Sequence, residues 1–183
     1  MPTFDDYVPV TLRTPRLSLE PLLATHAAEV FDLLQDLDHY TFIPQIPPDS
    51  LDGLRRRYEH LETRRSPHGE QLWLNWLIRL SGGEAAGLVQ ATVYPDGRAL
   101  LAYELFKPFR GQGLATEALR TTLDHLRDKA RITKARAVVD TRNTKSFRLL
   151  ERLGFERVRM IPNADWFKGS SSDEFEYVLT VTP

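Results

Sequence analysis

The sequence predicts a mixed α/β fold with a central, largely antiparallel sheet of about six to seven strands, flanked by about four helices. Three observations support this prediction. The chain has 183 residues, of which 42% are apolar, enough for one domain with a buried core. Three strand-like runs follow one another across short turns, and a long periodic helix then leads to further strand-like runs. We therefore expect residues 1–183 to form a single domain.

The N-terminal part of the chain predicts one strand and two helices joined by a loop. Residues 16–21 alternate apolar and polar side chains, as a half-buried strand does. From a candidate N-cap at Thr25 to Leu37, apolar residues recur at a helical period. Residues 39–48, rich in aromatic residues and proline, predict a loop. Residues 50–64 predict a second helix, whose run of consecutive arginines we interpret as a solvated face.

The middle of the chain predicts an antiparallel meander. Residues 71–78, 85–94 and 98–106 are strand-like, and they are separated by turn signals at residues 81–84 and 95–97. Such short connections join neighbouring antiparallel strands.

The C-terminal half predicts two helices, each followed by a strand or strands. A strongly periodic helix covers about residues 113–129, and a strand covers residues 135–140. A short helix over residues 143–153 ends at a glycine, and residues 155–160 and 174–181 are again strand-like.

Composition excludes several classes of function. Lys and Arg number 24 and Asp and Glu 25, for a net charge of −1, so no basic field exists to hold a nucleic acid. The chain has no Cys, and its 5 histidines show no metal-ligand spacing, so we predict no metal site. Residues 1–6 do not resemble a signal peptide, and the apolar run at residues 99–103 is too short to span a membrane. These features favour a cytoplasmic protein that does not bind membranes.

The strongest local signal is a glycine-containing segment, residues 109–116, between a strand and the long helix. Glycines there allow close backbone approach, and the first amides of the helix form an anion site suited to a pyrophosphate. The same glycines could form only a tight strand-to-helix turn. A P-loop is excluded because the chain has no Gly-Lys-Ser/Thr tripeptide. A dinucleotide fingerprint is disfavoured by Thr116, which stands where a third Gly or Ala is needed.

Here the sequence resembles a known family. The motif Arg110-x-x-Gly113-x-Ala115 is similar to the acetyl-CoA loop of the GNAT superfamily of N-acetyltransferases. Asn143-x-x-Ser146, followed by Leu-Gly-Phe at residues 153–155, resembles a second element of that superfamily. Residues 12–19 resemble the opening of the branch that includes ribosomal-protein N-terminal acetyltransferases. These elements occur in the family's order and span nearly the whole chain.

The resemblance implies acetyl-CoA as cosubstrate and a cofactor site at a splayed sheet. In the family, the strand before the loop carries a bulge and diverges from the next strand, so that pantetheine pairs with its free backbone groups. The Arg110 side chain would be free to add positive charge, and we expect Glu117 to point away from the ligand. The implied cofactor-binding residues are Leu105, Phe106, Lys107, Arg110, Gly111, Gln112, Gly113, Leu114, Ala115, Thr116, Asn143 and Ser146.

Two residues are candidates for catalysis. Many members of the superfamily use a tyrosine as general acid where this chain has Leu150, but the ribosomal-protein branch places a serine at the position of Ser146. Ser146 is therefore our candidate proton donor, and it could alternatively be a hydroxyl that bonds only within its own helix. Glu104 is our candidate base because it is a carboxylate in an otherwise apolar strand. If its side chain faces solvent, it has no role.

The acceptor is predicted to be a primary amine. A protein N-terminal α-amine, with a pKa of about 8, needs less help from a base than a lysine amine at about 10.4, and a small-molecule amine is also open. In this fold the acceptor contacts would come from residues 38–44 and 163–169, where aromatic side chains and acids could hold an ammonium. A non-catalytic acyl-CoA-binding or interaction module is the alternative function, and a nucleotide-binding oxidoreductase is disfavoured by the meander. Family members often dimerise, so a homodimer is also open.

Overall fold

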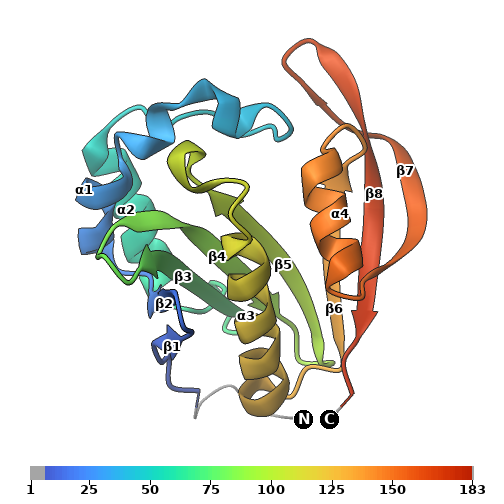
Figure 1. Cartoon of the computed structure of the whole chain (residues 1–183), viewed down its shortest axis with the longest axis horizontal. Coiled ribbons are helices and arrows are strands. Elements are labelled where there is room, and N and C mark those ends of the chain that lie inside the picture. The colour runs from blue at the N-terminus through green and yellow to red at the C-terminus, as the bar shows by residue number, and fades with distance from the viewer. Residues whose placement is uncertain (1–6, 183) are drawn as a thin grey trace.

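The computed structural model describes residues 7–182, so the sequence features of residues 1–6 lie outside the described part. The described chain forms one eight-stranded sheet in the order β1-β2-β3-β4-β5-β6-β8-β7 (Figure 1). All neighbouring strands are antiparallel except β5 and β6, which are parallel. The strands are β1 (Leu12–Arg13), β2 (Leu17–Pro21), β3 (Leu72–Leu80), β4 (Ala85–Val93), β5 (Arg98–Leu105), β6 (Lys134–Asp140), β7 (Glu156–Phe167) and β8 (Ser170–Thr180).

Four α-helices accompany the sheet in the described chain, which confirms the predicted fold class, with slightly more strands than expected. They are α1 (Ala27–Val30), α2 (Leu51–Glu62), α3 (Leu114–Ala130) and α4 (Thr144–Arg152). Short 3-10 turns are η2 (Ala24–His26), η3 (Leu33–Gln35), η4 (Leu37–Tyr40) and η5 (Lys107–Phe109). The N-cap residues Ser50 of α2 and Asn143 of α4 each accept a hydrogen bond from a backbone N–H of the first turn.

The sheet separates two hydrophobic cores. On one face, α3 packs its buried leucines and alanines against inward side chains of β2 to β6, including Trp76, Ile78 and Val89. On the other face, α1 and α2 cover a second cluster that includes Leu77, Leu88 and Phe106. Because β4 contributes to both cores, its side chains are buried on both faces.

The sheet opens between its two parallel strands. β5 pairs with β6 only from Arg98↔Lys134 to Leu100↔Arg136, and beyond this point the strands diverge, as the opening in Figure 1 shows. The splay expected from the family resemblance is thus present. The expected bulge is not found between the two described strands: the register of β5 with β4 is continuous from Val93↔Ala99 to Gly87↔Leu105. The register shift lies instead between β3 and β4, at Ile78 and Arg79.

Two predicted elements differ from the structure. The helix expected from Thr25 to Leu37 is broken into the single turn α1 and the 3-10 turns η2, η3 and η4. Leu23 rather than Thr25 is the cap of the first turn. Asp36 separates η3 from η4: its backbone is extended and its side chain accepts a hydrogen bond from the Asp38 N–H, since aspartate competes for backbone donors in this way.

The last two strands are longer than predicted. β7 and β8 form a hairpin that includes residues 163–167, which we expected to be part of a loop. Two register shifts, between Arg157 and Arg159 and between Ile161 and Asp165, interrupt the pairing. These irregularities hide the two-residue alternation that would identify a continuous strand.

Candidate active site

The glycine-containing segment between β5 and α3 has the conformation that its glycines allow. Gly111 and Gly113 have φ of 78° and 76°, a region that other residues enter only with strain. Gly113 is the N-cap of α3, and the first i→i−4 hydrogen bond of the helix runs from the Glu117 N–H to its carbonyl. The amides of Leu114, Ala115 and Thr116 therefore precede the helical ladder and face an anion site.

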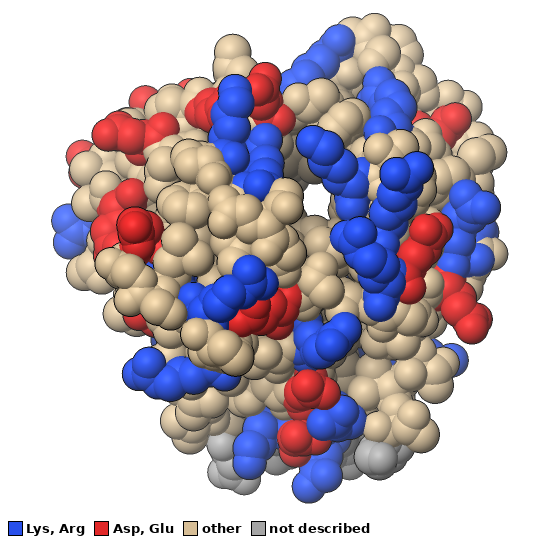
Figure 2. All heavy atoms as spheres, in the orientation of Figure 1, with Lys and Arg blue, Asp and Glu red and all other residues tan. Residues whose placement is uncertain are grey.

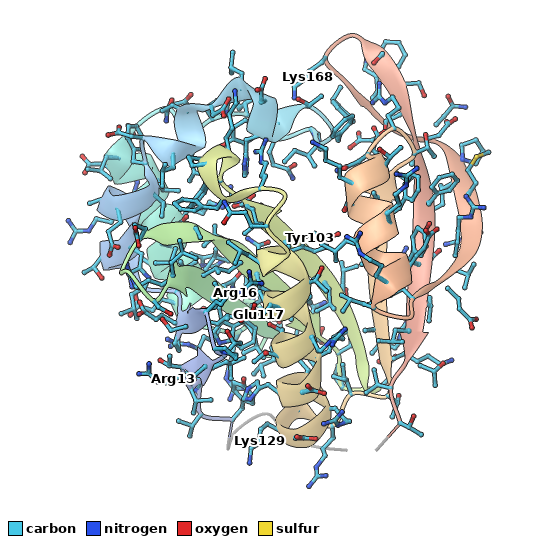
Figure 3. All side chains as sticks on the ribbon, viewed as in Figure 1. Arg13, Arg16, Tyr103, Glu117, Lys129 and Lys168 are labelled. Carbon is cyan, nitrogen blue, oxygen red and sulfur yellow. The ribbon has the colours of Figure 1, made fainter. Side chains whose placement is uncertain are left out.

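Side chains around this segment hold it in place without occupying the amides. Leu114 and Ala115 are buried in the core, so only their backbone groups are available to a ligand. Glu117 does point elsewhere: its carboxylate accepts hydrogen bonds from Thr14 Oγ1 at 2.5 Å and Arg16 Nε at 2.7 Å. Arg16 also donates to the Gln112 carbonyl at 3.0 Å. Figure 3 shows Arg16 and Glu117 together beside α3. This brace ties the segment to the start of β2.

The free edge of β5 presents backbone groups to the opening. The Phe106 N–H donates to the Ala86 carbonyl, and the Tyr94 N–H donates to the Arg98 carbonyl, so even-numbered residues of β5 direct their backbone groups toward β4. The backbone N–H and C=O groups of odd-numbered residues, including Tyr103 and Leu105, consequently point into the opening between β5 and β6. Of the predicted pantetheine partners, Leu105 lies at this edge, whereas Phe106 is turned toward β4 and Lys107 begins the turn η5.

The Arg110 side chain is not free, contrary to expectation. Its Nε donates to the Leu105 carbonyl at 2.9 Å, and its terminal NH2 group lies 3.3 Å from His39 Nδ1. The guanidinium is thus hydrogen-bonded to the Leu105 carbonyl at the open edge of β5, and it also contacts His39 in the turn η4. The reason is that η5 folds the chain back sharply after β5, which brings Arg110 beside the strand it follows.

Glu104 is held by a buried histidine. Glu104 Oε2 lies 2.7 Å from His39 Nε2, and the two side chains are 28% and 3% exposed, respectively. Arginine can only donate, so the Arg110 contact makes His39 Nδ1 an acceptor and places the imidazole proton on Nε2, from which it is donated to Glu104. Glu104 is therefore a partly buried side chain whose orientation is fixed by a hydrogen bond from His39. Its second oxygen remains available to a further donor.

A tyrosine hydroxyl lies beside Ser146. Tyr103 Oη is 2.7 Å from Ser146 Oγ and donates to the Ser146 carbonyl at 3.1 Å, and Figure 3 places Tyr103 between α3 and α4. Burial raises the pKa of Tyr103 to about 12, so the phenol stays protonated at neutral pH. The Ser146 N–H in turn donates to Asn143 Oδ1 at 3.2 Å. The cap of α4 thereby sets the position of both hydroxyls.

The two expected acceptor segments meet at the top of the opening. Lys168, at the turn of the β7–β8 hairpin, donates through Nζ to the carbonyls of Tyr40 and Ile43. Lys107 binds Asp38 at 2.6 Å and lies 3.8 Å from Asp36, which ties η4 to η5. Residues 38–44 and the end of the hairpin therefore lie over the same site.

Basic side chains lie along the opposite side of the opening. The exposed face of α4 carries Lys145, Arg148 and Arg152, and Figure 2 shows a column of Lys and Arg over this helix beside the hollow. Arg152 is close enough to Tyr103 to act on its pKa, in the lowering direction. Within residues 7–182 we find neither a metal-binding group of three or more His, Asp and Glu nor a helix suited to crossing a membrane.

Two residues of the site were missed by sequence reasoning. His39 lies in a segment that we interpreted as an acceptor loop, and Tyr103 lies in a strand that we described as apolar apart from Glu104. Tyr103 had a local signal, since it neighbours Glu104 in the strand before the loop. His39 had none, because it is 65 residues from Glu104 in the sequence.

Comparisons with known proteins agree with this geometry. Residues 16–156 match the family model of the acetyltransferase (GNAT) domain. An uncharacterized N-acetyltransferase, p20 from Bacillus licheniformis, is 29% identical over 84 residues, 46% of this chain and 47% of that protein. The match thus spans about half the length of this curated relative.

Solved structures share the fold across almost the whole chain. An acetyltransferase from Salmonella typhimurium that modifies the N-terminal serine of ribosomal protein L7/L12 has 18% identity and a TM-score of 0.83, covering 94% of this chain and 100% of its own. The microcin C7 self-immunity acetyltransferase MccE, solved with acetyl-CoA and AMP, has 18% identity and a TM-score of 0.81, covering 92% and 94%. The predicted resemblance to the GNAT superfamily is confirmed by the family model. The chain therefore belongs to the acetyltransferase (GNAT) domain family.

Proposed function

We propose that the protein is an acetyl-CoA-dependent N-acetyltransferase that moves an acetyl group directly to a primary amine in the cytoplasm. The observation that carries this proposal is the convergence of three features at one opening: the unpaired amides that begin α3, the free edge of β5, and two candidate proton-transfer groups. Family membership and the fold shared with a protein solved with acetyl-CoA support the same cosubstrate.

In this proposal the pyrophosphate of acetyl-CoA lies on the amides of Gly111 to Thr116 and the pantetheine lies along β5. The positive end of α3 favours the diphosphate, and the basic face of α4 adds charge on the other side of the opening. Arg110 then leaves the Leu105 carbonyl, which frees it for the pantetheine, and turns toward the phosphates. Asn143 contributes by holding the start of α4.

Glu104 is the proposed base. The amine nitrogen attacks the thioester carbonyl carbon, and the proton it loses passes to the free oxygen of Glu104. The hydrogen bond from His39 fixes the orientation of the carboxylate. Collapse of the intermediate breaks the carbon–sulfur bond and forms the amide.

The Ser146 and Tyr103 hydroxyls are the proposed acid. As the thiolate leaves, it takes a proton from Ser146 Oγ, which can be replaced by one from Tyr103 Oη at 2.7 Å. The absence of a tyrosine at position 150 favoured the alternative of a non-catalytic module. Leu150 is buried in the core. Tyr103, from β5, brings a phenol to Ser146 instead, so the lack of a tyrosine at position 150 no longer favours a non-catalytic module.

Thiol release tests the proposal. With acetyl-CoA and a panel of peptides and small amines, the wild type should release CoA thiol only when an amine is present. Glu104→Gln should lower kcat/KM by about 100-fold or more, the scale of a lost general base, while acetyl-CoA binding by calorimetry stays unchanged. Glu84→Gln, an exposed carboxylate at the β3–β4 turn, is the matched control. Acetyl-CoA binding without release on any amine would favour the binding module, and no binding at all would overturn both.

The assembly remains a prediction. We propose that residues 1–183 act as one domain, because a single sheet runs through the described residues. The expected homodimer is to be tested by sedimentation equilibrium.

A further inference from the structure

A pocket adjoins the proposed base on the face of the sheet that α2 covers. It has a volume of about 570 Å³ and reaches both Tyr103 and Glu104, a size that suits a small ligand. Its floor is formed by β4 and β5, one wall is α2, and the other is the segment from Tyr40 to Ser50. An amine in this pocket can therefore reach Glu104 while the rest of the molecule lies against α2.

The α2 wall carries two arginines with unused charge. Arg56 and Arg57 both line the pocket, and neither guanidinium forms an ion pair or a side-chain hydrogen bond with another residue in the range 7–182. Arg55, one residue earlier, pairs with Glu59 instead and does not line the pocket. Asp49 also lines the pocket, so the two guanidinium groups outnumber the acid on their side, while Glu104 stands at the reacting end.

A buried phenol lines the same pocket. Tyr58 lines the pocket and is 3% exposed, and its hydroxyl has no hydrogen-bond partner within the described chain. Burial raises the pKa of Tyr58, Glu104 raises it further and Arg57 lowers it, and the same two charges act on Tyr40. Both Glu104 and Arg57 therefore lie near enough to the two tyrosines to act on their pKa. A buried polar group without a partner is unfavourable unless a ligand or water supplies one.

We propose that this pocket binds a small zwitterionic amine, whose ammonium or amine group faces Glu104 and whose carboxylate or other anion is held by Arg57, with Tyr58 as an additional hydrogen-bond donor. This inference rests on the proposed function and narrows its acceptor. The presence of the Glu104 carboxylate and of Arg56 and Arg57 in the same pocket matches a molecule that carries both an amine and an anion. A plain alkylamine would leave Arg57 without a counter-ion, and the amine of a peptide N-terminus is followed by a neutral carbonyl.

The test compares acceptors that differ only in the anion. Thiol release is measured with phenylalanine and phenethylamine, with tyrosine and tyramine, and with a neutral tetrapeptide amide that begins with phenylalanine. Arg57→Gln should lower kcat/KM for the two amino acids by about tenfold or more, the value of a charge-assisted hydrogen bond, and change it by less than about twofold for the two amines. Comparing each variant with the wild type on the same acceptor cancels differences in amine pKa.

Two further variants complete the design. Arg55→Gln, on the same helix but outside the pocket, should leave every acceptor unchanged. Tyr58→Phe should lower kcat/KM for the amino acids more than for the amines. The inference is overturned if Arg57→Gln lowers kcat/KM equally for the amino acids and the amines. It is also overturned if the tetrapeptide is acetylated and the amino acids are not. In either case thiol release still supports the transferase, whereas no release with any acceptor overturns the transferase as well.

Discussion

The Tyr103–Ser146 contact joins two hydroxyls between which a proton can pass. The Tyr103 hydroxyl lies 3.1 Å from the Ser146 carbonyl, to which it donates, and 2.7 Å from Ser146 Oγ, so it can donate to Oγ instead once Ser146 has given up its own proton. The raised pKa of Tyr103, about 12, keeps the phenol protonated through the range in which the enzyme would work. The pair is therefore suited to supplying a proton to a thiolate and not to removing one from an amine.

Tyr103→Phe should lower kcat by about tenfold to 100-fold, because the relay loses one hydroxyl. The double variant with Ser146→Ala should be no slower than the slower single variant, since residues that act as one unit are not additive. Steady-state kinetics on the four proteins measures this. Tyr7→Phe, which removes a buried hydroxyl bonded to His125 at 2.6 Å, is the control and should retain activity. Fully additive losses would contradict a shared relay.

At the scale of elements, the close approach of β4 to β5 holds Glu104 in place. Gly87 lies opposite Leu105 in the register, and a Cβ atom at Gly87 would lie 2.1 Å from the Glu104 carbonyl oxygen. A side chain there requires the strand that carries the proposed base to move. The glycine thus serves packing between strands and not a turn.

Gly87→Ala should reduce the free energy of unfolding by about 1–3 kcal/mol, the usual effect of overpacking, and should also lower kcat through displacement of Glu104. Urea denaturation and thiol release measure the two effects. Gly82→Ala, in the β3–β4 turn, is the control because its Cβ would meet only the flexible end of Glu84. Equal free energies of unfolding for the two variants would show that β5 can move away from Gly87 without loss of stability.

At the scale of the molecule, the sheet separates the two proposed proton-transfer groups. Glu104 and Tyr103 are consecutive in β5, so their side chains leave opposite faces: Glu104 meets η4, and Tyr103 meets α4. A reaction that uses both must occur at the edge of the strand. The opening between β5 and β6 provides that edge. It lies between the His39–Glu104 contact on one face and the Tyr103–Ser146 contact on the other.

Stability of the whole molecule should fall in mild acid. Burial lowers the pKa of both His26 and His125 below the ordinary value of 6.5. Because the unfolded chain takes up these protons first, the contribution of both residues is present above about pH 6.5 and is lost as the pH falls through their folded-state values. Urea denaturation at about pH 7.5 and 5.5 should show this decrease, and His125→Gln should reduce it. A free energy of unfolding that is unchanged between these pH values would contradict the assignment.

Much of the fold, and the glycine-containing segment, could be predicted from the sequence because the patterns that indicate them are local. Helix α3 follows from its apolar period, α4 from Asn143 and its terminal glycine, and the meander from turn residues at short spacing. The segment from Arg110 to Thr116 follows from glycines whose positive φ no other residue adopts easily. Each of these depends on backbone geometry over a few neighbouring residues.

Tertiary structure alone decided how the site is assembled. The pairing of His39 with Glu104, the approach of Tyr103 to Ser146 and the position of Lys168 over Tyr40 join residues far apart in the chain. Such contacts depend on how the sheet splays and on how the segment from Ala24 to Tyr40 packs, where the helical period of the sequence is interrupted by 3-10 turns. The sequence by itself determined the family and the glycine-containing segment; packing between distant elements determined which side chains meet beside that segment.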